Sequence, residues 1–208
     1  MPIVPQASVM RHSTLAGTIH QGRELLARAP HVHLATTTPD GLPVLRALNA
    51  ALVEDFVLFH GAKAGEKSSC LGRIAVVSAV EEVAFIPSHF TNAHNACPAT
   101  TLFRSVQASG RLQDIQDLDV KAKMLTALMT KYQPEGGYAP IDPNTPEYRG
   151  EVKGVRVFGL KIQSLKTKLK LAQNKPEEVR NRLIAGLKRR NAPGDAAAIE
   201  AILDASSW

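Results

Sequence analysis

Three long runs of β-branched and apolar residues constrain the fold of this chain more than any other feature. They extend from Ile74 to Ile86, from Ala99 to Leu112 and from Val152 to Leu165. Runs of this composition, separated by polar segments, are typical of buried strands. Gly154 and Gly159 allow bends within the third run. The chain is therefore expected to be mainly β.

Shorter strands precede these runs. Residues 31–38 alternate in period two, the turn Pro39-Asp40-Gly41 follows, and residues 44–53 and 56–59 form two further strands. This pattern predicts a three-stranded antiparallel meander. Six or so strands with helices in the connections predict an antiparallel, Greek-key-like β-barrel with flanking helices, because closure removes exposed sheet edges.

Helices are expected at several connections and at the end of the chain. Ser13 is a candidate cap for a first helix, and Asp117 for one that carries an apolar stripe. Residues 133–147 are expected to form an irregular loop. Two terminal helices are expected, one starting near Pro176 and one capped by Asp195. The length of 208 residues suits a single domain, 1–208, with a helical appendage at about 175–205.

Composition excludes several classes of protein. No apolar run approaches the length of about 18 residues that a membrane helix needs. The first ten residues contain no Lys or Arg, which argues against a secretion signal, so a cytoplasmic location is the default expectation. Two cysteines, Cys70 and Cys97, do not suggest a disulfide framework.

The net charge of +6 favours a partner that carries phosphate. Much of the excess lies between Lys161 and Arg190, where the interleaved residues are aliphatic. No aromatic side chains in that stretch are available to stack on bases. We therefore rank a cofactor phosphate above nucleic acid.

A candidate anion site lies between Arg46 and Lys67. The segment predicts strand, turn, strand, and then a loop containing Gly61 and Gly65 that opens a short helix. A helix start presents free backbone N–H groups, and glycines let an anion approach the backbone. Lys67 adds a full positive charge, and Arg46 can contact further phosphate oxygens through its planar guanidinium. A surface loop with a solvated lysine explains the spacing equally well.

Three blocks in this order resemble the pyridoxamine 5′-phosphate oxidase-like split-barrel superfamily, and more closely its nitroimidazole-reductase-like branch. The first is Pro43-Val44-Leu45-Arg46-Ala47-Leu48-Asn49, and the second is Phe56-Val57-Leu58-Phe59-His60-Gly61-Ala62 followed by Gly65-Glu66-Lys67. The third is Cys97-Pro98-Ala99-Thr100-Thr101-Leu102-Phe103-Arg104-Ser105-Val106 with Gly110-Arg111. The late stretch 168–176 is similar to the end of FMN-binding regulators of this superfamily.

The resemblance implies a split β-barrel that binds flavin mononucleotide (FMN) at the interface of a homodimer. It places Arg46 and Lys67 at the phosphate. The other implied contacts are Ala47, Leu48 and Asn49 beside the flavin ring; Phe59, His60, Gly61 and Ala62 at the ribityl-phosphate side; Arg104 and Ser105 near the ring; and Lys170 and Gln173 in the tail, from the same or the other subunit.

The implied activity is that of a flavin-dependent oxidoreductase, which passes electrons from a reduced nicotinamide to a small nitro- or quinone-type acceptor. His60 is the candidate proton donor, since imidazole titrates near neutral pH. The only tryptophan is Trp208, so oxidation of pyridoxamine phosphate itself is disfavoured. Glu66 stands where a basic residue often precedes the lysine, which removes one positive charge from the phosphate site.

Alternatives remain open at this point. A flavin-binding sensor or regulator without turnover would show the same motifs, and some split barrels hold haem or deazaflavin. His33 shares a strand face with His31, which suits a polar barrel face better than a ligand pair. His89, His94 and Cys97 lie in one polar loop and could hold zinc, although no fourth ligand is evident. No metal is therefore expected.

Overall fold

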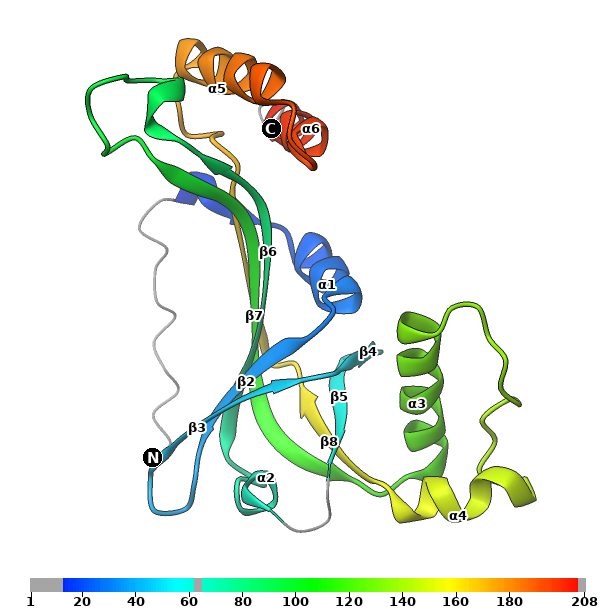
Figure 1. Ribbon diagram of the computed structural model, residues 1–208. Coiled ribbons are helices and arrows are strands. Elements are labelled where there is room, and N and C mark those ends of the chain that lie inside the picture. The colour runs from blue at the N-terminus through cyan, green and yellow to red at the C-terminus, as the bar shows by residue number, and fades with distance from the viewer. Residues whose placement is uncertain (1–12, 62–64, 206–208) are drawn as a thin grey trace. The chain divides into compact units, whose positions relative to one another are not determined.

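The computed structural model describes residues 13–61 and 65–205 (Figure 1). The contacts within the chain divide it into two compact units. The first unit comprises residues 13–18, 80–105 and 167–205. The second comprises residues 19–79, apart from 62–64, and 106–166. No helix in the described residues combines the length and the apolar character needed to cross a membrane.

An open, largely antiparallel sheet forms the second unit. Its strands follow the order β3-β2-β6-β7-β8-β5-β4. The bounds are β2 Val32–Thr37, β3 Pro43–Leu48, β4 Ala51–Val53, β5 Phe56–Gly61, β6 Ile74–Ile86, β7 Thr100–Ile115 and β8 Arg156–Lys161. The last residues of β6 and the first residues of β7 belong to the first unit. The expectation of a mainly β fold with flanking helices is confirmed.

The predicted three-stranded meander is wrong. β2 and β3 pair through the turn at Gly41, whose φ of 88° suits glycine. The predicted strand 44–53, however, divides into β3 and β4, separated by Asn49 and Ala50. β4 pairs with β5, and β5 pairs with β8, so β3 and β5 are not neighbours. The break after β3 lets the chain leave one end of the sheet and rejoin it at the other.

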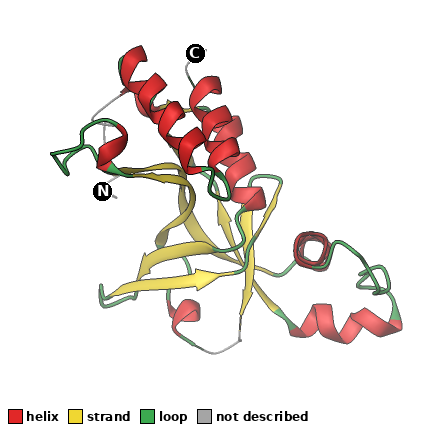
Figure 2. Ribbon diagram, turned by 45° about the horizontal axis from the view of Figure 1, so that its top comes forward, coloured by secondary structure: helices red, strands yellow, loops and turns green. Residues whose placement is uncertain are grey.

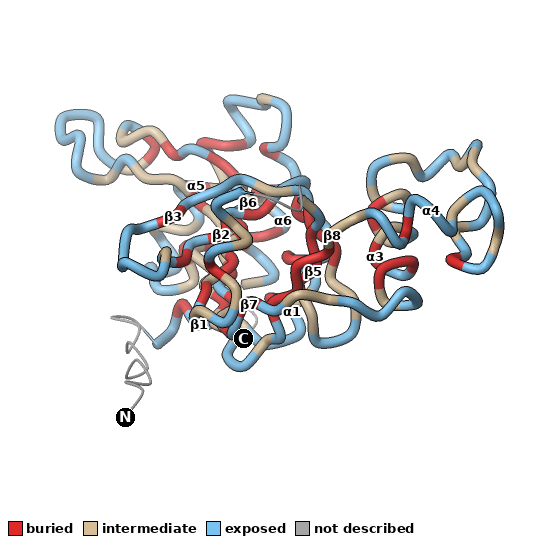
Figure 3. The backbone as a smooth tube through the Cα atoms, turned by 90° about the horizontal axis from the view of Figure 1, so that it is seen from below, coloured by how far each residue is buried: buried red, intermediate tan, exposed pale blue. Residues whose placement is uncertain are grey.

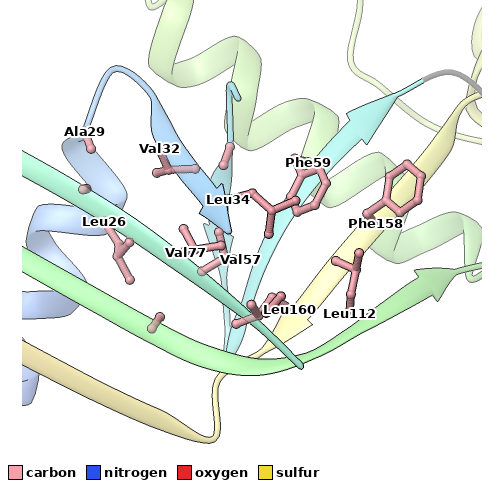
Figure 4. Close-up of a cluster of buried hydrophobic side chains, with 14 of the residues drawn as sticks. Leu26, Ala29, Val32, Leu34, Val57, Phe59, Val77, Leu112, Phe158 and Leu160 are labelled. Atoms are coloured by element: carbon pink, nitrogen blue, oxygen red, sulfur yellow. The ribbon is translucent and has the colours of Figure 1, made fainter. Parts of the chain in front are cut away.

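Apolar side chains from strands along the whole strand order form the core of the second unit (Figure 4). Leu34 of β2, Val77 of β6 and Leu112 of β7 are fully buried there. Phe59 of β5 stacks on Phe158 of β8, with ring centroids 5.5 Å apart. The alternation of buried and exposed residues along β2 is the period-two pattern that the sequence shows.

Helices flank the sheet of the second unit. They are α1 Ile19–Arg28, α2 Glu66–Ser69, α3 Leu118–Tyr132 and α4 Pro146–Gly154. Asp117 caps α3 as predicted, because its carboxylate accepts a hydrogen bond from the backbone N–H of Val120. Met124 and Leu128 of α3 pack with Leu58 of β5, and the buried residues of both elements stand out in Figure 3.

The first unit is built around two adjacent helices, α5 Glu177–Arg190 and α6 Asp195–Asp204 (Figure 2). Leu187 and Ile202 of these helices are fully buried with Ile86 of β6. Gly186 allows the ring of Phe90 to pack against α5, since a Cβ there would lie 2.3 Å from it. The unit also contains the short helices η1 Ser13–Leu15 and η2 Ser88–Phe90. Its strand β1 Ala16–Gly17 pairs with the part of β9 (Ser164–Lys170) that lies in this unit.

Four predicted boundaries need correction. Ser13 begins η1, and the first α-helix starts at Ile19 after β1 has paired with β9. Asp195 is the first residue of α6 and not its cap, because Gly194 occupies the cap position. The carboxylate of Asp195 instead accepts hydrogen bonds from Arg190 and from the backbone N–H of Ala192. The predicted loop 133–147 is shorter than expected, because α4 begins at Pro146. The predicted strand 152–165 is divided among the end of α4, the whole of β8 and the start of β9.

Candidate functional site

Arg46 and Lys67, the two predicted phosphate-binding cations, both lie at the short helix α2 in the second unit. Arg46 projects from β3 and forms an ion pair with Glu66, the residue before Lys67. Its other terminal nitrogen donates to the carbonyl of Leu45 at 2.7 Å. The acidic residue that the sequence marked as a departure from the family pattern therefore neutralises one of the two cations.

Lys67 lies over the backbone of β5 at Gly61. A Cβ on Gly61 would lie 2.9 Å from Cε and 3.1 Å from Nζ of Lys67, so the glycine lets this side chain lie against the strand without moving aside. Gly65, immediately before α2, has a φ of 135°, which also favours glycine. The two glycines of the predicted anion loop thus allow the backbone turn before α2 and the close approach of Lys67 to β5.

Arg156 is a third cation at α2, which sequence reasoning missed. It stands opposite Gly61 in the pairing of β5 with β8 and donates to Oγ of Ser68 at 3.1 Å. Its Nε and Nη2 donate to Oδ2 of Asp114 at 3.1 and 2.7 Å. Oδ1 of Asp114 is buried and has no hydrogen-bond partner among the described residues. A signal existed in the sequence, since Arg156 is a lone cation at the head of the apolar run 157–160.

The remaining predicted residues of the second unit are close in sequence to Arg46 or to Gly61, and their side chains differ in exposure. Ala47, Asn49 and His60 are exposed, and Leu48 is half-buried. Phe59 is fully buried in the aromatic stack, so its side chain serves the core, and only its backbone is available to a ligand. Ala62 lies outside the described residues. The site accordingly offers Arg46, Lys67, His60 and backbone groups of β3 and β5.

Four predicted residues belong to the first unit. Arg104 forms a 3.0 Å ion pair with Glu81, and Ser105 is half-buried beside it on β7. The amide of Gln173 bonds to backbone groups of its own turn, accepting from the N–H of Leu171 at 2.8 Å and donating to the carbonyl of Leu169. Gln173 therefore stabilises the turn after β9. Lys170 lines a pocket.

That pocket has a volume of about 490 Å³ and is lined entirely by residues of the first unit. Lys168 and Lys170 of β9 each place an ammonium 5.6 Å from the ring centroid of Phe103. Lys170 also donates to the hydroxyl of Thr100. The pKa of Lys170 is lowered by burial and, to a smaller extent, by the positive charges of Lys168 and Lys175. The pocket is thus strongly basic.

The histidine and cysteine side chains of the 88–97 region do not assemble a metal site. No group of three His, Cys, Asp or Glu side chains in the described part of the chain is close enough to hold a metal ion. The ring of His89 instead meets Phe90 edge-on, with centroids 5.2 Å apart. Cys97 is exposed and unbonded, and Cys70 is buried.

Comparison with known proteins gives a family match over most of the chain. The model of the pyridoxamine 5′-phosphate oxidase family matches residues 20–169, which include all of the second unit except its first residue. No curated protein shows a significant match to the chain.

Several solved structures share the fold. A flavocytochrome from Azotobacter vinelandii is 23% identical over 77% of this chain and 72% of its own, with a TM-score of 0.63. An FAD and heme binding protein from Mycobacterium smegmatis is 22% identical over 74% and 71%, with a TM-score of 0.59. A candidate 5-nitroimidazole antibiotic resistance protein from Bacteroides thetaiotaomicron is 17% identical over 74% and 85%, with a TM-score of 0.58. At these identities the likeness is one of fold.

Proposed function

The chain belongs to the pyridoxamine 5′-phosphate oxidase family, and on this premise we propose that it is a flavoprotein that binds FMN. The resemblance noted in the sequence is thereby confirmed at the level of the family, and the open antiparallel sheet agrees with a split barrel. One observation carries the proposal: Arg46 forms an ion pair with Glu66 of α2, and the next residue of α2, Lys67, lies over Gly61 of β5.

The phosphate of FMN is the group that this part of the structure suits. Lys67 lies over a glycine backbone and has no carboxylate partner among the described residues, so its ammonium can bind a phosphate oxygen. Arg46 can supply a second pair of donors once it leaves Glu66. One of the similar structures is described as an FAD and heme binding protein, which supports a flavin as the ligand. An absorption spectrum of the purified protein would distinguish a bound flavin from a bound haem.

Residues near the strand ends would orient the ring. Backbone groups at Leu48 and Asn49, at the end of β3, are the proposed contacts, and the exposed imidazole of His60 on β5 is the proposed proton donor. Bound flavin supplies two-electron transfer, here from a reduced nicotinamide to a nitro- or quinone-type acceptor. We propose a homodimer with the cofactor at its interface. Oxidation of pyridoxamine phosphate remains disfavoured.

Charge changes at α2 test the phosphate site. Lys67→Gln removes a charge-assisted hydrogen bond and should weaken FMN binding by about tenfold or more. Glu66→Gln frees Arg46 and should tighten binding, by up to about fivefold. Both are measured by quenching of FMN fluorescence on titration with protein. Lys153→Gln, an exposed change on α4, is the control and should leave affinity unchanged. Equal affinities for all three variants would remove the phosphate assignment.

Turnover separates an enzyme from a flavin store or sensor. Protein loaded with FMN should lose its visible flavin absorbance when mixed anaerobically with a reduced nicotinamide, and regain it on addition of a quinone. His60→Ala should lower this turnover by about 100-fold, the lower end of the usual range for general acids, with FMN affinity little changed. His20→Ala, an exposed change on α1, is the control. Protein that stays oxidised would instead favour a sensor or regulator.

A further inference from the structure

The basic pocket of the first unit contains none of the residues that the proposed flavin site uses, although the family resemblance had placed one of its residues, Lys170, near the cofactor. It is lined by the N-terminal segment at Leu15, by residues 97–103 and by the end of β9 with the turn that follows, as far as Lys175. All of these segments belong to one compact unit. A volume of about 490 Å³ falls within the range of small-molecule sites, roughly 300–1,000 Å³.

Three lysines converge on this pocket without a carboxylate to neutralise them. Lys168 and Lys170 share a face of β9, because they are two residues apart on a strand. Lys175 follows in the turn and lines the same space. None of the three forms an ion pair within the described residues, and no acidic residue lines the pocket. The three positive charges repel one another, and a bound polyanion would relieve this repulsion.

The rest of the wall is apolar or able to form neutral hydrogen bonds. The ring of Phe103 and the side chains of Leu15 and Pro98 supply apolar surface. The hydroxyl of Thr100 and the amide of Asn174 supply polar groups. A bare inorganic anion would leave the apolar surface without contacts, whereas an organic molecule with an anionic end would cover both parts.

We infer that the pocket of the first unit binds a small organic phosphate, with the phosphate at Lys168, Lys170 and Lys175 and the organic body against Phe103. A phosphate monoester carries a charge of about −1.5 to −2 at neutral pH, which matches three ammonium groups better than a monocarboxylate does. Nucleotides are the plainest members of this class, and the nucleotide end of an electron donor is one source. The site is independent of Arg46 and Lys67 and does not require the flavin proposal.

Cys97 provides a readout within the pocket. It is exposed and lines the pocket, whereas Cys70, the other of the two cysteines in the chain, is fully buried. Alkylation of the native protein by iodoacetamide therefore reports on Cys97. Adenosine monophosphate at about ten times its dissociation constant should slow this alkylation by about tenfold, because only the unoccupied fraction reacts.

Charge variants test whether the lysines hold the phosphate. Lys168→Gln and Lys170→Gln should each raise the concentration of adenosine monophosphate needed for protection by about tenfold. Lys188→Gln removes the same charge from an exposed position of α5 in the same unit and should leave protection unchanged. Each variant is compared with itself without nucleotide, so that altered thiol reactivity cancels. Lys67→Gln should also leave protection unchanged, which separates this test from that of the flavin site.

Four results would overturn the inference. Adenosine monophosphate could give no protection, or give equal protection in the Lys170→Gln variant. Inorganic phosphate could protect at the same concentration, in which case the organic body contributes nothing. FMN could protect at a far lower concentration than adenosine monophosphate, in which case the pocket belongs to the flavin.

Discussion

Replacing Gly110 by alanine is expected to lower the free energy of unfolding by about 3 kcal/mol. Gly110 lies on β7, and a Cβ at this position would be 2.0 Å from the backbone oxygen of Lys161 at the end of β8. A backbone carbonyl cannot rotate away as a flexible side chain can, so the two strands must separate locally. The glycine that follows the third family-like block is therefore a requirement of strand packing.

Urea denaturation followed by circular dichroism measures this effect. Gly150→Ala is the matched control, because a Cβ there meets nothing within 4 Å and Gly150 lies inside α4. Alanine at that position should leave stability unchanged or raise it by up to about 1 kcal/mol. An unfolding midpoint for Gly110→Ala equal to that of the parent protein would show that β7 and β8 approach less closely than described.

Replacing Arg156 by methionine is expected to cost about 3 kcal/mol of stability and to weaken FMN binding. The change leaves the half-buried carboxylate of Asp114 without its guanidinium partner and removes a hydrogen bond to Ser68 of α2. Methionine preserves much of the contact with Phe158, whose ring centroid lies 5.4 Å from the guanidinium carbon. The loss should therefore report on charge and hydrogen bonding.

A double-mutant cycle isolates the pair. Asp114→Asn in the Arg156→Met background should restore part of the lost stability, with a coupling energy of about 1–3 kcal/mol. Arg149→Met, an exposed change on α4 in the same unit, should alter stability by less than about 0.5 kcal/mol. If the effects of the single changes at Arg156 and Asp114 simply add, the ion pair contributes nothing to stability.

Local signals in the sequence located most of the elements and part of the candidate site. The turn at Gly41, the cap at Asp117 and the alternation in β2 are consequences of neighbouring residues, and each was predictable. Gly61 and Lys67 could both be assigned to the loop before α2 for the same reason, because they are only six positions apart in the sequence. Glu66 was recognised as a departure, and its ion pair with Arg46 gives that departure a physical meaning.

Long-range pairing was not predictable in the same way. Period-two alternation shows that a segment is a strand with one buried face, but it does not select the strand beside it. The hairpin of β4 and β5 follows from the local turn between them, but Asn49 and Ala50 give no sign that β4 lies at the other end of the strand order from β3, and the meander failed for this reason. Arg156 was missed because its place at α2 depends on the pairing of β5 with β8.

By itself, the sequence determined the β-rich character of the chain, its family, and the glycines and cations of the loop before α2. Only the tertiary structure decided which strands are neighbours, that Arg156 joins Arg46 and Lys67 at α2, and that three lysines and Phe103 enclose a pocket. The physical reason is the range of the forces involved. Strand propensity and turn chemistry act over a few residues, whereas burial and charge pairing act between residues that are distant along the chain.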